Sequence, residues 1–287
     1  MLGANQMNIT SGNTFRRDIW SKELTRATEA NLVLADKVSR FDADSKGAKS
    51  VYIPKISNLV AYNKVANTAV ALQNPTETST NLLLDKHKYC AFLLEDYLKI
   101  QQNYALLSEY SNKAGYAIAK AMDTDIATLA TGFSQTKGTY NTTITTTVMV
   151  DSVQELDDED VPADDRCWVL KPHAVADLRT ISDYIRFDGT GFAGGTATGA
   201  LGNGKKGAKG LVGMLFGSPV YQTTQIQQTS NDISNMYFHK EAIALGVQQE
   251  VRIQNEYKLE YLGELVVADI SYGVIERRDE FGLELKN

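Results

Sequence analysis

The stretch VPADDRCWVLKPHAVADL, from Val161 to Leu178, combines side-chain types that enzymes use for nucleophilic and acid–base chemistry. It holds Cys167, His173, one arginine and three aspartates, and a cysteine beside a histidine could act as an activated nucleophile. However, Cys167 lies within a strand-like run, residues 166–170, whereas His173 follows Pro172, a residue that favours the first turn of a helix. The pattern gives these two side chains no reason to converge, so we expect a buried structural cysteine and a surface histidine.

The other candidate catalytic and binding motifs are incomplete. None of the three histidines, at positions 87, 173 and 239, has a second ligand at the spacing of a metal site. The acidic run DDED, residues 157–160, lacks the spacing and the glycine of a calcium loop, so it is expected to be a solvated helix end. The stretch GNGKKGAKG, residues 202–210, lacks the P-loop motif and precedes a strand rather than a helix. We therefore expect no enzyme activity, no metal and no cofactor; a soluble enzyme with a glycine-rich lid is the weaker alternative.

The composition is that of a folded protein. The 287 residues are 43% apolar and 22% charged, which is far from the signature of a disordered chain. A net charge of -6 argues against a dedicated nucleic-acid binder, whose affinity would come from pairing with phosphates. No apolar run approaches the length that spans a bilayer, and the first residues lack the pattern of a signal peptide. We expect synthesis in the cytosol and no membrane partner.

Hydrophobic periodicity predicts two helices and a long hairpin in the first half of the chain. An amphipathic helix is expected from Arg16 to about Phe41, with Trp20 and Leu24 on its apolar face. Residues 50–94 are rich in β-branched and aromatic side chains on both sides of the polar turn NPTETSTN, which predicts a two-stranded hairpin. A helix about 50 Å long is expected from Asp96 to Thr131.

The predicted hairpin has a consequence for assembly. An isolated two-stranded hairpin is marginal in water, so an arm that projects from the body needs a neighbouring surface. The obvious supplier of that surface is another copy of the chain. We also expect that deletion of residues 51–94 would leave folding of the central domain largely intact while abolishing assembly.

The second half of the chain predicts a mixed α+β layer. Residues 138–149 have strand character and lead into a short acidic helix that ends before Pro162. A strand follows over residues 166–170, and a helix begins at Pro172. The glycine density of residues 189–213 predicts a flexible loop, after which strand-like runs continue to the C-terminus.

Two phrases of the sequence resemble a known family. LDDEDVPADDRCWVLKPHAVADL, residues 156–178, has a helix ending in Leu-Asp, then Val-Pro, an arginine opening a strand and a proline opening a helix. GLVGMLFGSPVYQT, residues 210–223, has a strand in which glycines precede Pro219 and Val220. Both phrases, and the order of the elements, are similar to the major capsid proteins of tailed bacteriophages with the Hong Kong 97-type fold. The chain resembles most the short-tailed phage branch, which assembles without chemical cross-links.

The resemblance implies a division of the chain. It predicts an N-terminal arm, an extended hairpin loop that lies across an adjacent subunit, a peripheral domain with a long spine helix, an axial domain with the glycine-rich loop 189–213, and returning strands shared by both domains. The corresponding ranges are 1–49, 50–94, 95–146, 147–235 and 236–287.

The resemblance also implies a function and partners. The chain is expected to be a structural subunit that forms pentamers and hexamers of an icosahedral virion capsid, enclosing double-stranded DNA without sequence-specific contact. A separate scaffolding protein and a portal are expected partners, with synthesis in the cytoplasm of a bacterial host. Non-covalent contacts are favoured over an isopeptide bond from Lys55 or Lys64. An encapsulin-like compartment remains the alternative. The contents of purified shells distinguish the two, since a phage capsid would hold DNA and an encapsulin a cargo enzyme.

The expected contacts between subunits come from the arm, the hairpin and the strand that begins at Arg166. The side chain of Arg166 could form an ion pair between subunits. The candidate residues are Trp20, Leu24, Val51, Ile53, Val60, Tyr62, Val70, Leu72, Leu84, Tyr89 and Arg166.

Overall fold

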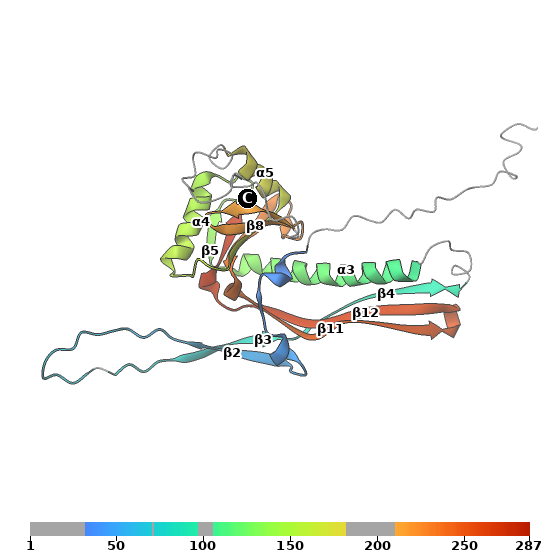
Figure 1. Cartoon of the computed structure of the whole chain (residues 1–287), viewed down its shortest axis with the longest axis horizontal. Helices are drawn as coiled ribbons and strands as arrows, with labels where there is room; N and C mark the ends of the chain where they lie inside the picture. Colours follow the sequence, from blue (N-terminus) through green and yellow to red (C-terminus); the bar gives the residue numbers. More distant parts are fainter. Residues whose placement is uncertain (1–31, 71, 97–105, 182–209) are drawn as a thin grey trace, which may run out of the picture.

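The computed structural model describes residues 32–70, 72–96, 106–181 and 210–287. The predicted glycine-rich loop, most of the predicted N-terminal helix and the predicted start of the long helix lie outside the described residues. The described chain forms a compact body, a long flat layer beside it, and a hairpin that projects past the body (Figure 1). This mixture of helices and sheets confirms the predicted α+β class.

The compact body is built on a seven-stranded sheet with the order β5-β13-β10-β6-β8-β7, and β9 pairs with β10. Its strands are β5 (Gln135–Gly138), β6 (Arg166–Leu170), β7 (Leu211–Leu215), β8 (Ser218–Gln222), β9 (Gln228–Thr229), β10 (Asp232–His239) and β13 (Gly282–Lys286). Every residue of the central strand β6 is buried, and Trp168 stacks on Tyr237 of β10 with ring centroids 3.7 Å apart. Helices α4 (Thr146–Asp158) and α5 (Pro172–Thr180) flank the sheet.

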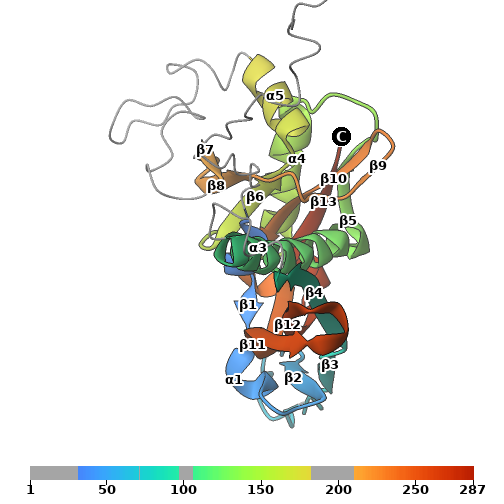
Figure 2. The same cartoon turned by 90° about the vertical axis from the view of Figure 1, so that its right-hand side faces the viewer.

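The flat layer is a four-stranded sheet with the order β1-β11-β12-β4, covered by the long helix α3. Its elements are β1 (Ser39–Arg40), β4 (Lys86–Glu95), β11 (Ile243–Lys258), β12 (Gly263–Glu276), α3 (Leu106–Ala127) and the 3-10 turn η3 (Thr128–Gly132). Seen end-on, α3 lies between this sheet and the compact body (Figure 2). Ala114 and Ile118, two residues of the predicted helical stripe, are buried there. The long helix is therefore confirmed from residue 106 to Ala127, which is four residues short of the predicted end, and the 3-10 turn η3 follows it to Gly132.

The projecting hairpin is shorter than the sequence predicts. Strands β2 (Ser50–Ile56) and β3 (Glu77–Leu83) pair with each other, but residues 86–95 form β4, which pairs with β12 instead. The predicted single hairpin strand up to Leu94 is therefore wrong beyond Leu83. The alternation of apolar and polar residues along the sequence could not show that the hairpin ends before β4, because β12, the partner of β4, lies far along the chain.

Two further local predictions are corrected. The predicted N-terminal helix does not continue through residues 32–41, where the chain forms the 3-10 turn η2 (Leu34–Asp36), strand β1 and then the short helix α1 (Asp42–Ser45). The predicted threonine-rich strand is a turn that leads into α4, because Thr145 caps this helix by accepting a hydrogen bond from the N–H of Val148. Threonine favours strands and helix N-caps alike, so its density alone did not distinguish them.

The elements around the opening stretch are confirmed. β6 covers residues 166–170, and α5 begins with Pro172 in its first turn. β7 and β8 form an antiparallel pair in the second resembling phrase. Within the described residues, no helix is long and apolar enough to cross a membrane.

Candidate interaction surface

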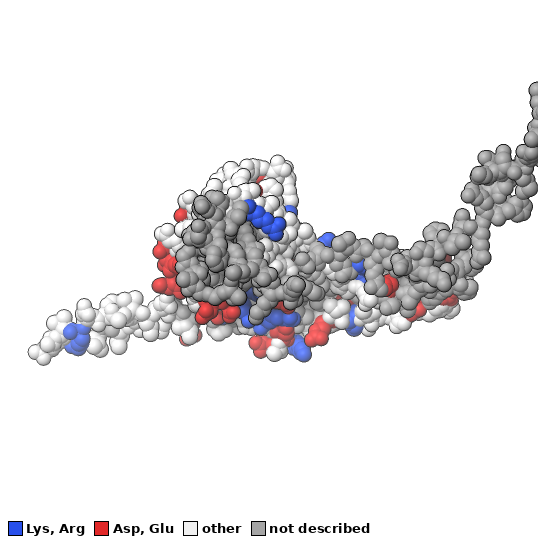
Figure 3. Space-filling view, turned by 45° about the horizontal axis from the view of Figure 1, so that its top comes forward, with Lys and Arg blue, Asp and Glu red and all other residues white. Residues whose placement is uncertain are grey.

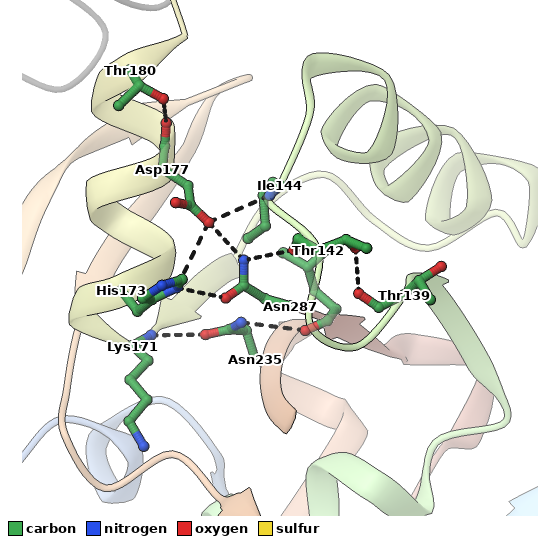
Figure 4. A network of polar contacts seen from close by, with 10 residues as sticks. Thr139, Thr142, Ile144, Lys171, His173, Asp177, Thr180, Asn235 and Asn287 are labelled. Atoms are coloured by element: carbon green, nitrogen blue, oxygen red, sulfur yellow. Dashed lines mark hydrogen bonds and ion pairs between the residues drawn. The ribbon is translucent and has the colours of Figure 1, made fainter. Parts of the chain in front are cut away.

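The residues of the opening stretch do not form a nucleophile and base. Cys167 is buried in β6, and burial raises the pKa of its thiol to about 12, which disfavours the thiolate that a nucleophile needs. Nδ1 of His173 lies 2.9 Å from Oδ1 of Asn287 (Figure 4). The expected structural cysteine is confirmed, and His173 belongs to a separate network.

That network fastens the end of β13 to the start of α4 and to α5. The side-chain amide of Asn287 donates to Oδ2 of Asp177 at 2.7 Å and to the carbonyl oxygen of Thr142 at 3.2 Å (Figure 4). Asn235 of β10 accepts a hydrogen bond from the N–H of residue 171 at 2.8 Å. The sequence pattern did not point to either asparagine, because each is defined by partners from distant segments. These contacts give His173 and Asp177 of α5 structural partners.

Arg166, the predicted partner in an ion pair between subunits, has its partners inside its own chain. Its guanidinium is 3% exposed and donates to Oδ1 of Asp157 at 2.6 Å and to the carbonyl oxygen of Pro162 at 2.9 Å. A further N–H of the guanidinium donates to the carbonyl oxygen of Val161. Arg166 therefore closes the turn between α4 and β6.

The remaining histidines also have structural partners. Nδ1 of His239 accepts a hydrogen bond from the N–H of Glu241 at 3.2 Å, and Nε2 of His87 lies 3.2 Å from Oδ2 of Asp269. In the part of the chain that the structure describes, no three His, Cys, Asp or Glu side chains are placed to hold a metal ion.

An exposed apolar surface lies on the tip of the hairpin, residues 57–76. Among these twenty positions Lys64 is the one charged residue in the sequence, and the projecting arm is almost free of charge in the space-filling view (Figure 3). The large apolar side chains exposed on the tip are Leu59, Val60, Tyr62, Val65, Val70 and Leu72. Because burial of one such side chain contributes about 1.5–3 kcal/mol, this surface has the chemistry of a protein contact.

Apart from Arg166, the predicted contact residues fall into three groups. Those fully available on the surface are Val60, Tyr62, Val70, Leu72 and Tyr89. Ile53 and Leu84 are instead buried in a small cluster with Leu82 and Ala244, and Val51 is half-buried against it. Trp20 and Leu24 lie outside the described residues. Ile53 and Leu84 thus hold the root of the hairpin on its own chain, where strand alternation turns them inward.

A second apolar surface lies at the opposite end of the molecule, at the turn between β11 and β12 (Figure 1). Tyr257, Leu259, Tyr261 and Leu262 are exposed there, with Leu259 at 78% and Leu262 at 65%. The sequence pattern missed this surface, because the run around it alternates like an ordinary half-buried strand. A molecule with unlike apolar ends is suited to head-to-tail contacts between copies.

Two carboxylates, one buried and one half-buried, join the parts of the chain. Asp123 of α3 is 1% exposed and accepts hydrogen bonds from the N–H groups of Val33, Leu34 and Ala35, at 2.7, 3.2 and 3.1 Å. Burial nevertheless raises the pKa of Asp123. Glu276 lies where β12 leaves the flat layer for the compact body, and burial raises its pKa to about 7, aided by a hydrogen bond to Asp279.

A third carboxylate ties the strands of the flat layer together. Arg252 of β11 donates two hydrogen bonds to Asp269 of β12, at 3.0 and 2.9 Å, and lowers the pKa of this carboxyl group. His87 of β4 and Gln249 of β11 reach the same carboxylate at 3.2 Å each. The cluster spans three neighbouring strands and stiffens the sheet.

The sequence matched no family model and no curated protein. Among solved structures, the chain is similar to one from Mycobacterium phage Che8, with 20% identity, a TM-score of 0.77, and coverage of 95% of this chain and 97% of that one. It is similar to a chain of the capsid of the cyanophage P-SCSP1u, with 15% identity, a TM-score of 0.76 and coverage of 98% and 95%. For the capsid of Ralstonia phage GP4 the identity is 12%, the TM-score 0.69 and the coverage 99% and 98%. The chain therefore has the fold found in phage capsids.

Proposed function

We propose that this chain is a major capsid protein, the structural subunit of an icosahedral phage shell. The observation that carries the proposal is the agreement of fold over nearly the whole length of both chains with subunits of phage capsids. The short-tailed branch of the Hong Kong 97-type fold is the assignment we favour. In this role the chain has no catalytic step, and its work is assembly.

The shape of the chain supports a head-to-tail mode of assembly. The exposed apolar side chains of the hairpin tip and those of the turn between β11 and β12 lie at opposite ends of the long axis (Figure 1). When one end of a subunit binds the unlike end of the next copy, the copies form a closed ring if the rotation from copy to copy adds up to a full turn. We infer rings of five and six copies, in which the hairpin tip of each subunit lies across its neighbour.

We propose the following domains for the chain. Residues 1–49 are the N-terminal arm, 50–94 the extended loop, 95–146 the peripheral domain, 147–235 the axial domain, and 236–287 the strands that return through both. The structure modifies this scheme in one place, since β4 belongs to the flat layer and not to the projecting loop.

Contacts between subunits are proposed to be non-covalent. Nζ of Lys55 forms an ion pair with Glu280 at 2.7 Å, and Nζ of Lys64 donates to carbonyl oxygens of the hairpin tip itself. Both lysines thus have partners within their own chain. Arg166 has a role within its own chain as well.

The shell is proposed to enclose double-stranded DNA without sequence-specific contact, in a virion made in a bacterial host. The net charge of -6 fits a wall that does not trap the packaged nucleic acid. A separate scaffolding protein and a portal are the further partners that this role requires.

Size-exclusion chromatography and negative-stain microscopy of the purified chain test the proposal. We expect capsomers or closed shells for the natural chain, and their loss when Leu59, Val60 and Tyr62 are replaced by serine. These three side chains are exposed, so their replacement should leave the melting temperature unchanged. A natural chain that stays monomeric or dimeric at every concentration would refute the role.

A further inference from the structure

A cationic pocket lies at the root of the hairpin, where β2 and β3 meet the segment that follows β12. It is a cavity of about 240 Å³, walled by β2 and Thr80 on one side and by Arg277 and Arg278 on the other. Lys55 also lines the pocket, with its Nζ paired to Glu280 at 2.7 Å. The volume is below the range of about 300–1,000 Å³ that is usual for cofactors and drug-sized ligands. It is large enough for one carboxylate side chain.

The two arginines of this pocket are poorly paired within the chain. Both reach the same carboxylate, Glu241, at 3.7 Å from Arg277 and 3.6 Å from Arg278, which is beyond the length of a charge-assisted hydrogen bond. Each guanidinium lies over an aromatic ring, Arg277 over Phe41 and Arg278 over Phe281, with 5.6 and 4.7 Å to the ring centroids. Stacking fixes the plane of a guanidinium and leaves its in-plane N–H donors free to bind a carboxylate.

The same chain carries an exposed acidic ridge elsewhere. The C-terminal end of α4 continues into residues 157–160, DDED, and acidic side chains gather on this flank of the compact body (Figure 3). Arg166 binds Asp157, but no described cation lies within reach of Glu159 or Asp160, which are both exposed. Asp160 has a φ of 55°, so the chain turns sharply there and presents the ridge at a corner.

We propose that the pocket of Lys55, Arg277 and Arg278 binds a carboxylate of Glu159 or Asp160 from a second copy of this chain. The inference rests on the proposed assembly and specifies one of its contacts. Two guanidiniums with free N–H donors match a carboxylate in geometry and charge, and complementary charges at unlike sites fix the register of a head-to-tail contact. The ion pair Lys55–Glu280 holds the hairpin strand beside the pocket, so the contact would also set the direction of the hairpin.

Charge reversal tests the contact in the full chain. One variant carries Arg277→Glu and Arg278→Glu, a second carries Glu159→Lys and Asp160→Lys, and a third carries all four changes. We expect each double variant to raise the protein concentration needed for half-maximal assembly at least tenfold, and the fourfold variant to recover most of that loss. The control Lys46→Glu with Lys49→Glu changes charge by the same amount at exposed residues outside the pocket, and should have little effect.

A cross-linking experiment reads the same contact without requiring shells. Chains with Arg278→Cys are mixed with chains carrying Asp160→Cys under mild oxidation, and disulfide-linked dimers are expected from the mixture but not from either variant alone.

If the natural chain forms shells while charge reversal and cross-linking have no effect, the contact is refuted and the function stands. If the mixture cross-links but no rings or shells form, the contact stands and the capsid role fails. Absence of both cross-links and charge-dependent association overturns the contact.

Discussion

At the scale of single residues, the buried carboxylate of Asp123 and the half-buried carboxylate of Glu276 join segments that are distant in the sequence. Asp123 connects α3 to the residues that lead into β1, and Glu276 sits at the passage from the flat layer to the compact body. A buried polar group is costly unless it is paired, so each of these residues should have a measurable effect on stability.

Replacement of Asp123 by alanine should lower the free energy of unfolding by about 3 kcal/mol, because three backbone N–H groups lose their acceptor in a buried site. Asp123→Asn keeps one carbonyl oxygen and should cost about half as much. Denaturant unfolding of both variants measures the difference, with the exposed Asp44→Ala as control. An equal free energy of unfolding for Asp123→Ala and the natural chain would show that the three hydrogen bonds do not contribute to stability.

Glu276 should make stability depend on pH near neutrality. Its folded pKa of about 7 lies above the value of about 4.3 of an unfolded glutamate, so its contribution is complete below pH 4 and is lost as the pH rises through 7. Glu276→Gln keeps a donor toward Asp279 and carries no charge. We expect this variant to be more stable than the natural chain at pH 8.5, by roughly 1 kcal/mol after screening by solvent, and to differ less at pH 5.

Thermal melts at the two pH values check this expectation, with Glu260→Gln at an exposed turn as the matched control. The same gain at both pH values would attribute the effect to packing rather than to the charge of Glu276.

At the scale of elements, the seat of the hairpin on the flat layer depends on close approach of backbones. A Cβ at Gly273 of β12 would overlap the carbonyl oxygen of Leu83, the last residue of β3. Gly273→Ala should therefore destabilise the protein by about 2 kcal/mol and loosen the hairpin root. Gly115→Ala is the matched control, since nothing lies within 4 Å of that position in α3 and alanine favours a helix. Melting temperatures compare the two, and an unchanged value for Gly273→Ala would contradict the close contact.

The hairpin tip should be dispensable for folding and necessary for assembly. Replacement of residues 57–76 by a short Asn-Gly turn removes exposed side chains and leaves the pairing of β2 with β3. We expect the melting temperature to stay within a few degrees and ring formation to be lost. The larger deletion of residues 51–94 is now expected to unfold the flat layer, because it removes β4 from its ten-residue pairing with β12. Rings formed by the chain with the short turn would contradict the role of the tip.

The sequence predicted those elements whose partners are local or whose periodicity is long. The stripe of α3, the strand β6 and the proline that opens α5 were all readable from spacing. The assignment of β4 and the exposed ends of β11 and β12 were not, since strand pairing over more than 160 positions leaves no local signal. The hydrogen bonds of Asn287 and Asp123 were missed for the same reason, because their partners lie far along the chain. The polar residues near Cys167 resembled a catalytic site because turns and helix N-caps use the same side-chain types.

At the scale of the whole molecule, the chain carries an exposed apolar surface at each of two unlike ends, the hairpin tip and the turn between β11 and β12. The described residues contain a full core in the compact body, with Trp168, Tyr237 and Phe238 completely buried, so the body does not require a partner to fold. The hairpin tip, by contrast, has its large apolar side chains in solvent. Such a subunit should be stable alone and should associate through many weak contacts that add up in a ring or shell.

Electron cryomicroscopy of the purified, concentrated chain tests this claim most directly. We expect rings with five- or six-fold symmetry, or closed shells built from them, in which density for the hairpin tip lies across the adjacent subunit. Particles that remain single folded chains or two-fold dimers at every concentration would contradict it.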